Sequence, residues 1–474
     1  MLFNGRSRQL PRSFRLILSS FLQRPGLPFA DVLTEESIQA AFDDEGVSFG
    51  NDPDTLYTPA MTLWAFLSQV LFKDEQRSCI AAVARIVVLW IALERGPCSG
   101  NTGAYCRARA KLSEAAIHRL AADVANGCER QVPEKWLWRG RHVHLVDGTT
   151  ASMPDTPENQ AEYPQPPQQE KGLGFPMARL VVLLSLATGM VGDMAMGPYT
   201  GKETGETALL RQLLGRFAPG DILLADRYYC SYFMIVLLME LGIDFVTRLH
   251  QRRQIDFRRG RRLGKGDHIV EWKRPEKPEW MDQTTYDRMP PTIQVREVHV
   301  HVGHPGFRTE SLVVVSTLTD ADQYTQADIA ELYGQRWLAE LDIRAIKITM
   351  GMDVLRCKTP AMVRKEMWTC LLAYNLIRRA MLQSAKESNQ SPRALSFCAA
   401  LQAIAASWQV IVLSDDSVVA RMVDAELKNL AAHIVGDRPG RVEPRAIKRR
   451  PKPHDLLTKP RHKARAELLG ARSS

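Results

Sequence analysis

This chain of 474 residues has little of what marks several common protein classes. Its eight cysteines form no Cys-x-x-Cys pair, which argues against a zinc module and for reduced thiols in a cytoplasmic protein. Its longest apolar run, 80–93, spans fourteen residues and contains Arg85, whereas a membrane-spanning helix needs ~20 apolar residues. The apolar stretch 16–22 contains two serines and precedes no cleavage pattern, so we expect neither a signal peptide nor a membrane partner.

Several catalytic motifs are also missing. The chain has no Gly-rich nucleotide loop, no His-Glu-x-x-His pair, no Ser-His-Asp spacing and no repeat of solenoid period. What it does have is 45% hydrophobic and 24% charged residues, the balance of a folded protein. At ~150 residues per domain, its length allows about three domains.

Positive charge is concentrated in two islands, although the net charge is only +9. The tail 438–474 holds twelve basic and three acidic residues, and segment 251–274 holds nine basic and three acidic ones. The rest of the chain is therefore acidic. Concentrated basic residues favour a polyanion such as DNA, because neutralising phosphates releases condensed counterions. A solvated tail that only aids solubility is the alternative.

The first 140 residues have helical periodicity. Apolar residues recur every three or four positions in 60–72, 78–94 and 113–127, which predicts three helices. The basic segment 105–111 places Arg107 and Lys111 on one helical face, with Arg109 beside them, and either contacts DNA or is an ordinary solvated face.

From residue 139 the pattern predicts an α/β arrangement. The alternating segment 142–146 predicts a strand that ends in a turn at Asp147-Gly148, and a long Pro/Gln-rich loop follows. A buried strand at 221–225 leads directly to Asp226. The remaining predicted elements are a hairpin at 178–186 and 190–196, a helix at 206–217, a helix ending near 241 and a strand at 244–249.

Segment 251–317 is rich in strand patterns broken by Pro and Gly, which predicts a β insertion carrying the second basic island. Helical periodicity returns at Thr325, a candidate N-cap with Asp328 as its capping-box partner. We expect one helix from there to Gly351. At ~100° per residue, the side chains of Tyr333, Arg336, Glu340 and Lys347 would lie on one narrow stripe of it.

The acids Asp147, Asp226 and Glu340 suggest a metal site. Three converging carboxylates repel one another unless a cation intervenes, and hard oxygen ligands select Mg²⁺ or Mn²⁺. The alternatives are that the two aspartates cap turns and that the helix stripe is an ordinary exposed face. A second candidate, Glu297 with His299 and His301 near His304, is better explained by the alternation of a solvated strand.

These residues resemble a known family. Tyr333-x2-Arg336-x3-Glu340-x6-Lys347 matches the signature of the DDE insertion-sequence transposases called the fourth family. HLVDGTTASMPDTPENQ and GDILLADRYY resemble the flanks of that family's two aspartates, and the similarity covers about residues 141–381. The resemblance implies a ribonuclease H-like mixed sheet with a β-strand-rich insertion.

The resemblance also implies roles for individual residues. Asp147, Asp226 and Glu340 would be the catalytic acids that bind two Mg²⁺ ions, with Mn²⁺ able to substitute. Tyr333, Arg336 and Lys347 would contact DNA phosphates. In some relatives a tryptophan stacks on a flipped base. The corresponding stretch here, FRTESLVVVST, has none, which leaves Trp272 and Trp280 as candidates.

The leading hypothesis is a transposase that cuts the ends of an insertion element and joins the 3′-hydroxyls to target DNA. A stand-alone metal-dependent nuclease and a catalytically silent DNA-binding relic remain alternatives. We expect a helical domain at 1–138 for end recognition or dimerisation, a catalytic domain at 139–385 with the insertion at about 250–318, and a helical region at 386–474 with a basic tail.

The expected partners are the element's terminal repeats, target DNA and a second copy of the chain, in the bacterial cytoplasm at the nucleoid. The expected DNA contacts in the two basic islands are Arg258, Arg259, Arg261, Arg262, Lys448, Arg449 and Arg450.

Overall fold

The computed structural model describes residues 40–47, 49–50, 55–72, 74–92, 96–301, 311–414, 416–436 and 456–470. The tail residues Lys448, Arg449 and Arg450 lie outside these ranges. The chain divides into two compact units, each made of separate segments. The helical unit comprises residues 1–136, 187–192 and 342–435, and the sheet unit comprises 137–186, 193–341 and 436–474.

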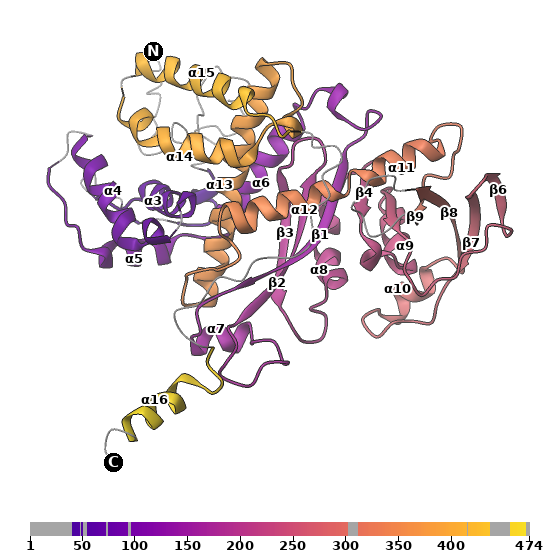
Figure 1. Ribbon diagram of the computed structural model, residues 1–474, viewed down its shortest axis with the longest axis horizontal. Coiled ribbons are helices and arrows are strands. Elements are labelled where there is room, and N and C mark those ends of the chain that lie inside the picture. The colour runs from indigo at the N-terminus through magenta and orange to yellow at the C-terminus, as the bar shows by residue number, and fades with distance from the viewer. Residues whose placement is uncertain are drawn as a thin grey trace, which may run out of the picture. The chain divides into compact units, whose positions relative to one another are not determined.

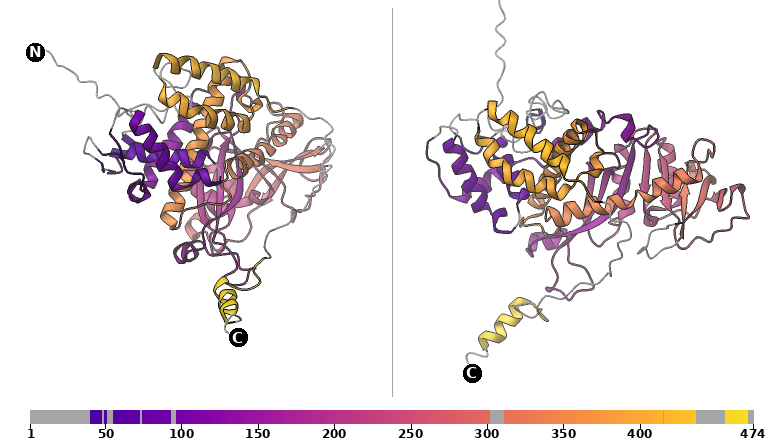
Figure 2. Two further views of the ribbon diagram at one scale, coloured as in Figure 1. Left: turned by 60° about the vertical axis from the view of Figure 1, so that its left-hand side comes forward. Right: turned by 45° about the horizontal axis from the view of Figure 1, so that its top comes forward.

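The helical unit is built around one long helix, α13, which packs against α3, α6, α14 and α15. Figures 1 and 2 show α14 and α15 lying side by side. Its α-helices are α3 (Pro59–Leu71), α4 (Cys79–Ala92), α5 (Thr102–Lys111), α6 (Glu114–Glu129), α13 (Pro360–Glu387), α14 (Phe397–Leu413) and α15 (Asp416–Ala432). The three helices predicted from periodicity near the N-terminus are confirmed.

In the basic segment on α5, Arg107 and Lys111 are exposed, which agrees with both interpretations, whereas Arg109 is half-buried. Arg109 is neither a solvated residue nor a free cation. Its guanidinium donates to Gln69 Oε1 at 3.1 Å and lies 5.0 Å from the centre of the Phe66 ring. The neighbouring Tyr105 is fully buried. Arg109 is therefore part of the packing of α3 against α5, because its side chain points into the unit.

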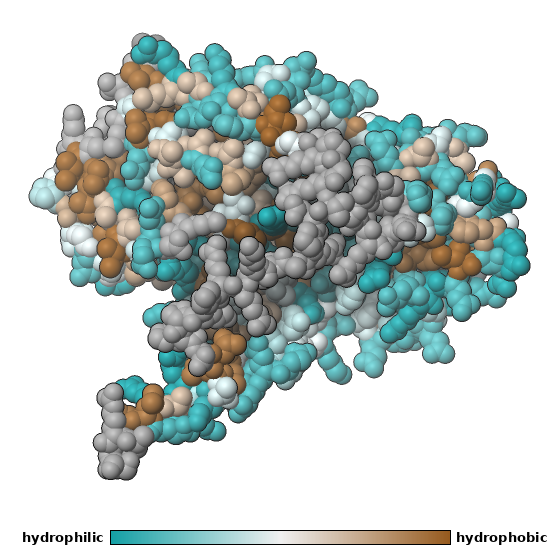
Figure 3. Space-filling view, in the orientation of Figure 1, coloured by the Kyte–Doolittle hydropathy of each residue, from teal (hydrophilic) through white to brown (hydrophobic). Residues whose placement is uncertain are grey.

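Helix α4 carries exposed apolar side chains on its outer face. Ile80, Val88 and Ile91 are 73%, 60% and 56% exposed. Figure 3 shows hydrophobic residues gathered on the surface around this helix. Exposed apolar residues at helical spacing often mark a contact surface.

The sheet unit contains a nine-stranded sheet in the order β3-β2-β1-β4-β5-β9-β8-β7-β6 (Figure 1). The strands are β1 (Val143–Ser152), β2 (Met177–Ser185), β3 (Val191–Pro198), β4 (Ile222–Ala225), β5 (Asp244–Arg248), β6 (Arg261–Gly264), β7 (Asp267–Lys273), β8 (Thr292–His301) and β9 (Ser311–Ser316). The helices are α7 (Pro157–Glu162), α8 (Glu206–Gln212), α9 (Tyr232–Glu240), α10 (Gln283–Arg288), α11 (Gln326–Gly334), α12 (Trp337–Arg344), whose residues from Asp342 on belong to the helical unit, and α16 (Arg461–Gly470).

The first five strands have the predicted ribonuclease H-like arrangement. Strand β1 is antiparallel to β2 and parallel to β4, and β4 is parallel to β5. The β insertion is not a separate layer. Its last strand, β9, pairs with β5, so β9, β8, β7 and β6 extend the same sheet.

The predicted turn at Asp147-Gly148 is wrong. Strand β1 continues to Ser152, and Asp147 pairs with Val182 of β2 in its interior. The β-branched residues Thr149 and Thr150, together with nine consecutive pairs to β2, keep the chain extended where Asp-Gly suggested a turn.

The single helix predicted from Thr325 to Gly351 is broken in two. Its start is as predicted, because Thr325 and Asp328 form a capping box, and Gly351 ends the segment with φ +72°. Helix α11 nevertheless stops at Gly334, and α12 begins at Trp337. A π-helix, Ala345–Thr349, follows. Figures 1 and 2 show α11 and α12 following one another along nearly a common line.

None of the described helices combines the length and the apolar character needed to cross a bilayer.

Candidate active site at the edge of the sheet

Two of the predicted acids lie at the same level on neighbouring parallel strands. Val143 of β1 pairs with Ile222 of β4, and Leu145 pairs with Leu224. The same register, continued by two residues, sets Asp147 beside Asp226. Asp226 follows the end of β4, and Asp147 lies within β1, which is longer. Parallel pairing therefore brings together two carboxylates that are 79 positions apart in the chain.

Asp226 also caps a short helix, as the turn-capping interpretation expected. Its Oδ1 accepts from the backbone N–H of Tyr228 at 2.5 Å, at the start of the 3₁₀ helix Arg227–Tyr229. The hydroxyl of Thr247 on β5 donates to the Asp226 carbonyl oxygen at 2.7 Å. Capping uses one carboxylate oxygen and holds the residue at the strand end, so the capping and catalytic interpretations are compatible.

Asp147 lies in an environment that disfavours its charge. Its pKa is raised to about 6, chiefly by burial and also by the nearby charges of Asp226 and Glu206, against the lowering effects of Arg336 and the Gly148 N–H. Like charges held close together in a partly buried place are characteristic of functional sites.

Arg336, which lies between α11 and α12, connects the signature residues to the edge that carries the two aspartates. It forms an ion pair with Glu340, one turn later on the chain, and its guanidinium charge also lowers the pKa of Asp147. Tyr333 is buried, and burial raises its pKa to about 12 against the opposing effect of Arg336. The Glu340 side chain is 59% exposed. Tyr333, Arg336 and Glu340 thus belong to one cluster, whereas Lys347 lies in the π-helix of the helical unit.

The two aspartates provide the oxygen ligands that a hard divalent cation requires. Asp147 and Asp226 offer carboxylate oxygens whose mutual repulsion a cation would relieve. In the described part of the chain, no three His, Cys, Asp or Glu side chains stand close enough to hold a metal as they are. Glu340 is engaged by Arg336, so it would join the two aspartates only after leaving that ion pair.

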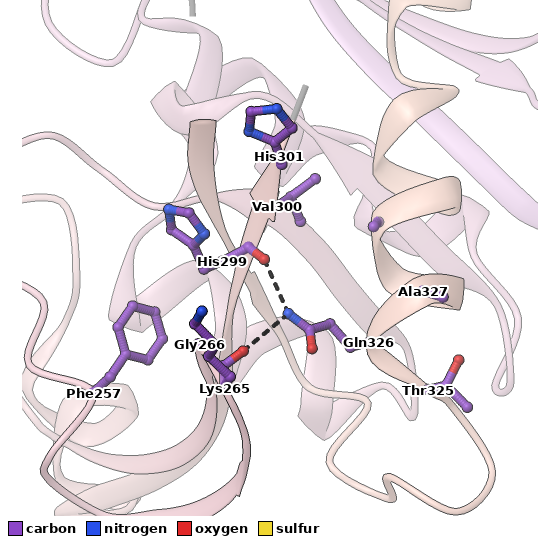
Figure 4. Close-up of a pocket in the computed structure, with 10 residues that line it drawn as sticks. Phe257, Lys265, Gly266, His299, Val300, His301, Thr325, Gln326 and Ala327 are labelled. Carbon is purple, nitrogen blue, oxygen red and sulfur yellow. Dashed lines mark hydrogen bonds between the residues drawn. The ribbon is translucent and has the colours of Figure 1, made fainter. Parts of the chain in front are cut away.

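The histidines of β8 do not form the alternative metal site within the described residues. Glu297 is buried, accepting from Trp272 Nε1 at 3.0 Å and lying 2.9 Å from His268 Nε2. His299 and His301 instead line a cavity of about 730 Å³ between β8 and α11 (Figure 4). There the Gln326 amide donates to the His299 carbonyl at 3.1 Å. His304 lies outside the described residues.

The arginines of the insertion island are exposed. The side chains of Arg258 and Arg259 are 90% and 82% exposed, beside Asp256. Arg261 and Arg262 are exposed on β6, the last strand of the sheet. All four are accessible to a polyanion, although Arg258 and Arg259 pair with Asp256.

The two tryptophans of the insertion differ in access. Trp272 is 4% exposed, and the guanidinium of Arg253 lies 3.6 Å from its ring centre. Its indole is therefore closed to a base. Trp280 is half-buried, with the guanidinium of Arg211 3.8 Å from its ring centre.

One carboxylate at this edge was missed in the sequence. Glu206 begins α8, and its charge interacts with those of Asp147 and Asp226. Burial raises its pKa, and Asp226 raises it further. The only available signal was Gly148, whose lack of a side chain leaves room for a neighbour.

The family of the chain follows from its match to known sequences. The model of the transposase DDE domain matches residues 138–376, just over half of the chain, and includes the two aspartates and the signature helix. The chain belongs to the DDE-domain transposase family. The predicted resemblance is therefore confirmed at the level of the family.

Two curated relatives of this DDE-domain protein come from Escherichia coli K12. The transposase InsG for insertion sequence element IS4 is 28% identical over 302 residues, 62% of this chain and 64% of InsG. The putative transposase InsZ is 26% identical over 178 residues, 37% of this chain and 58% of InsZ. The chain thus spans less than two thirds of the length of each relative.

Among solved structures, the cryo-EM structure of the piggyBac transposase synaptic complex with hairpin DNA is similar to this chain. The sequences are 9% identical, the TM-score is 0.42, and the match covers 87% of this chain and 85% of the other.

Proposed function

We propose that this DDE-domain protein is a transposase that cuts the ends of an insertion element and joins the freed 3′-hydroxyls to target DNA. The observation that carries the proposal is the juxtaposition of Asp147 and Asp226 on parallel strands, with Arg336 acting on Asp147 and paired to Glu340. The family match supports the same reaction class.

In this proposal Asp147, Asp226 and Glu340 hold two Mg²⁺ ions, for which Mn²⁺ can substitute. When bound, such ions activate a water or a 3′-hydroxyl and stabilise the leaving oxygen of an in-line displacement at phosphorus. Arg336 and Tyr333 bind the phosphate beside the acids, and Lys347 contributes a further phosphate contact. An Arg336 that binds phosphate releases Glu340, which then turns toward the aspartates.

The basic islands bind the DNA flanking the cut. The exposure of Arg258, Arg259, Arg261 and Arg262 supports this role for the insertion, and Lys448, Arg449 and Arg450 have it in the tail. Two element ends require two active sites, so the DNA-bound form is a homodimer in the bacterial cytoplasm at the nucleoid. The exposed apolar face of α4 supports a contact role for the N-terminal region, 1–138, in dimerisation or end recognition.

An end-joining assay tests the function. Purified protein, Mg²⁺, DNA carrying the element's terminal repeats and a target plasmid should give cut ends and then joined products. Metal-dependent cutting without joining would instead indicate a stand-alone nuclease. DNA binding with neither reaction would indicate a silent relic.

A further inference from the structure

Glu206 lies against the backbone of β1 at Gly148, in space that a side chain on that residue would enter. A Cβ atom at Gly148 would stand 2.1 Å from Glu206 Cδ and within 2.5 Å of both carboxylate oxygens. Real Cβ atoms do not approach other atoms so closely, so the carboxylate occupies the space of the missing side chain. Gly148 directly follows Asp147. The Glu206 carboxylate is therefore packed against the residue next to a proposed metal ligand.

The other side of the Glu206 carboxylate is held by the segment that follows Asp226. The hydroxyl of Tyr229 donates to Glu206 Oε2 at 3.3 Å, and Tyr229 is fully buried. Tyr229 is the last residue of the short helix that Asp226 caps. Glu206 thus bridges the two chain segments that deliver Asp147 and Asp226.

Glu206 has no cation of its own in ion-pair contact among the described residues. By contrast, Glu203, three positions earlier in the chain, forms an ion pair with Arg211. The Arg179 guanidinium, which acts on Glu206 only through its charge, is engaged with the Thr204 carbonyl oxygen at 3.0 Å. Glu206 is the first residue of α8, where the helix dipole favours its negative charge.

We propose that Glu206 supplies a fourth carboxylate to the metal site, reaching it over Gly148 when the acids close on a cation, because no three of the described acids could hold one as they stand. This inference rests on the proposed function, because it assigns Glu206 to the cation that Asp147 and Asp226 would hold. It gives the edge a donor that the signature residues do not include. It also gives a role to the space beside Asp147 that Gly148 leaves open and the Glu206 carboxylate occupies.

Mn²⁺ binding by the full-length protein without DNA, followed by electron paramagnetic resonance of the free ion, tests the proposal. Glu206→Gln keeps the shape of the side chain and an acceptor for Tyr229. We expect it to weaken Mn²⁺ binding roughly tenfold to a hundredfold, the range found when groups supporting a metal site are removed. Glu203→Gln is the matched control and should bind Mn²⁺ like the wild type.

A second variant, at Gly148, displaces the Glu206 carboxylate without removing it. Gly148→Ala places a methyl group where the Glu206 carboxylate lies, so it should weaken Mn²⁺ binding in the same direction while every acid remains present. Circular dichroism and the thermal midpoint of each variant report whether the fold is kept. Glu206→Gln removes a charge from an acidic cluster, so its thermal midpoint should not fall.

The outcomes separate the two levels of the proposal. If Asp147→Asn weakens Mn²⁺ binding and Glu206→Gln does not, Glu206 is a packing residue and this inference is overturned, while the proposed function stands. A lower thermal midpoint with unchanged Mn²⁺ affinity in Glu206→Gln has the same meaning. If neither Asp147→Asn nor Glu206→Gln alters Mn²⁺ binding, the acids do not form a metal site, and the proposed function fails with the inference.

Discussion

Two carboxylates of this protein, one in each unit, lie in opposite electrostatic surroundings. In the helical unit, Asp342 is 2% exposed and accepts from Arg378 at 2.5 Å and from Arg393 at 2.7 Å. In the sheet unit, Asp147 is half-buried near other carboxylates, and its pKa rises to about 6. A compensated acid contributes to the fold, whereas an acid left among like charges costs stability and is retained for another purpose.

We expect the largest effect when the cutting activities of variants at two aspartates, one at each end of β4, are compared. Asp226→Asn should lower metal-dependent cutting of repeat-end DNA by about a thousandfold or more, because it removes a proposed metal ligand. Asp221, just before the strand, lies 3.0 Å from His144 Nε2, away from the acid cluster. Asp221→Asn is therefore the control and should still cut. Equal loss in both variants would show that β4 matters only for folding.

Replacing Asp342, the acid paired with two arginines, should destabilise the helical unit. Asp342→Asn leaves the buried Arg378 and the half-buried Arg393 without their carboxylate, and breaking a buried ion pair in this way costs about 3–5 kcal/mol. Urea unfolding measures the loss. A decrease below about 1 kcal/mol would mean that the network does not hold α13 to its neighbours.

In the sheet unit, replacing Asp147 should stabilise the fold instead of destabilising it, and the size of this effect should depend on pH. Because the folded state raises the pKa of Asp147 from 3.8 to about 6, it holds this proton more tightly than the unfolded chain does. The penalty is absent below pH 3.8 and complete above about pH 6. Asp147→Asn should therefore stabilise the metal-free protein by roughly 3 kcal/mol at pH 8 and hardly at all at pH 4. Urea unfolding in EDTA at both values gives the comparison, which fails if the variant is destabilised at pH 8.

The smallest effect concerns the exposed charges of the insertion. Replacing Arg261 and Arg262 by alanine removes two proposed phosphate contacts, so the slope of log affinity against log salt concentration should become shallower by about 2. Arg288→Ala, outside the basic island and paired with Glu240, is the control. An unchanged slope in the double variant would remove β6 from the DNA-binding surface.

Local patterns predicted much of this architecture. The strand before Asp226, the hairpin of β2 and β3, and the Thr325 capping box depend on neighbours in sequence, and the structure contains all three. Asp-Gly misled because its usual meaning is a turn, whereas pairing with β2 holds Asp147 and Gly148 in an extended strand. Tertiary pairing outweighs a two-residue preference.

The break between α11 and α12 had a weak sequence signal in Gly334, which helical periodicity masked. The role of Glu206 had no sequence signal apart from Gly148. The two residues are in contact in the fold but are 58 positions apart in the chain. Long-range approaches of this kind arise from how the sheet and α8 pack, which no local pattern records. The roles of the signature residues rest on the family resemblance, not on spacing.

The central claim is that the carboxylates at this edge act together on DNA phosphate. Its most direct test is single-turnover cutting of repeat-end DNA in Mg²⁺ by wild type and Glu340→Gln, at protein concentrations that saturate the DNA, with Glu331→Gln on α11 as the control. The account predicts that Glu340→Gln binds DNA as tightly as the wild type and cuts below about a thousandth of its rate. Metal-dependent cutting by Glu340→Gln above that level would contradict it.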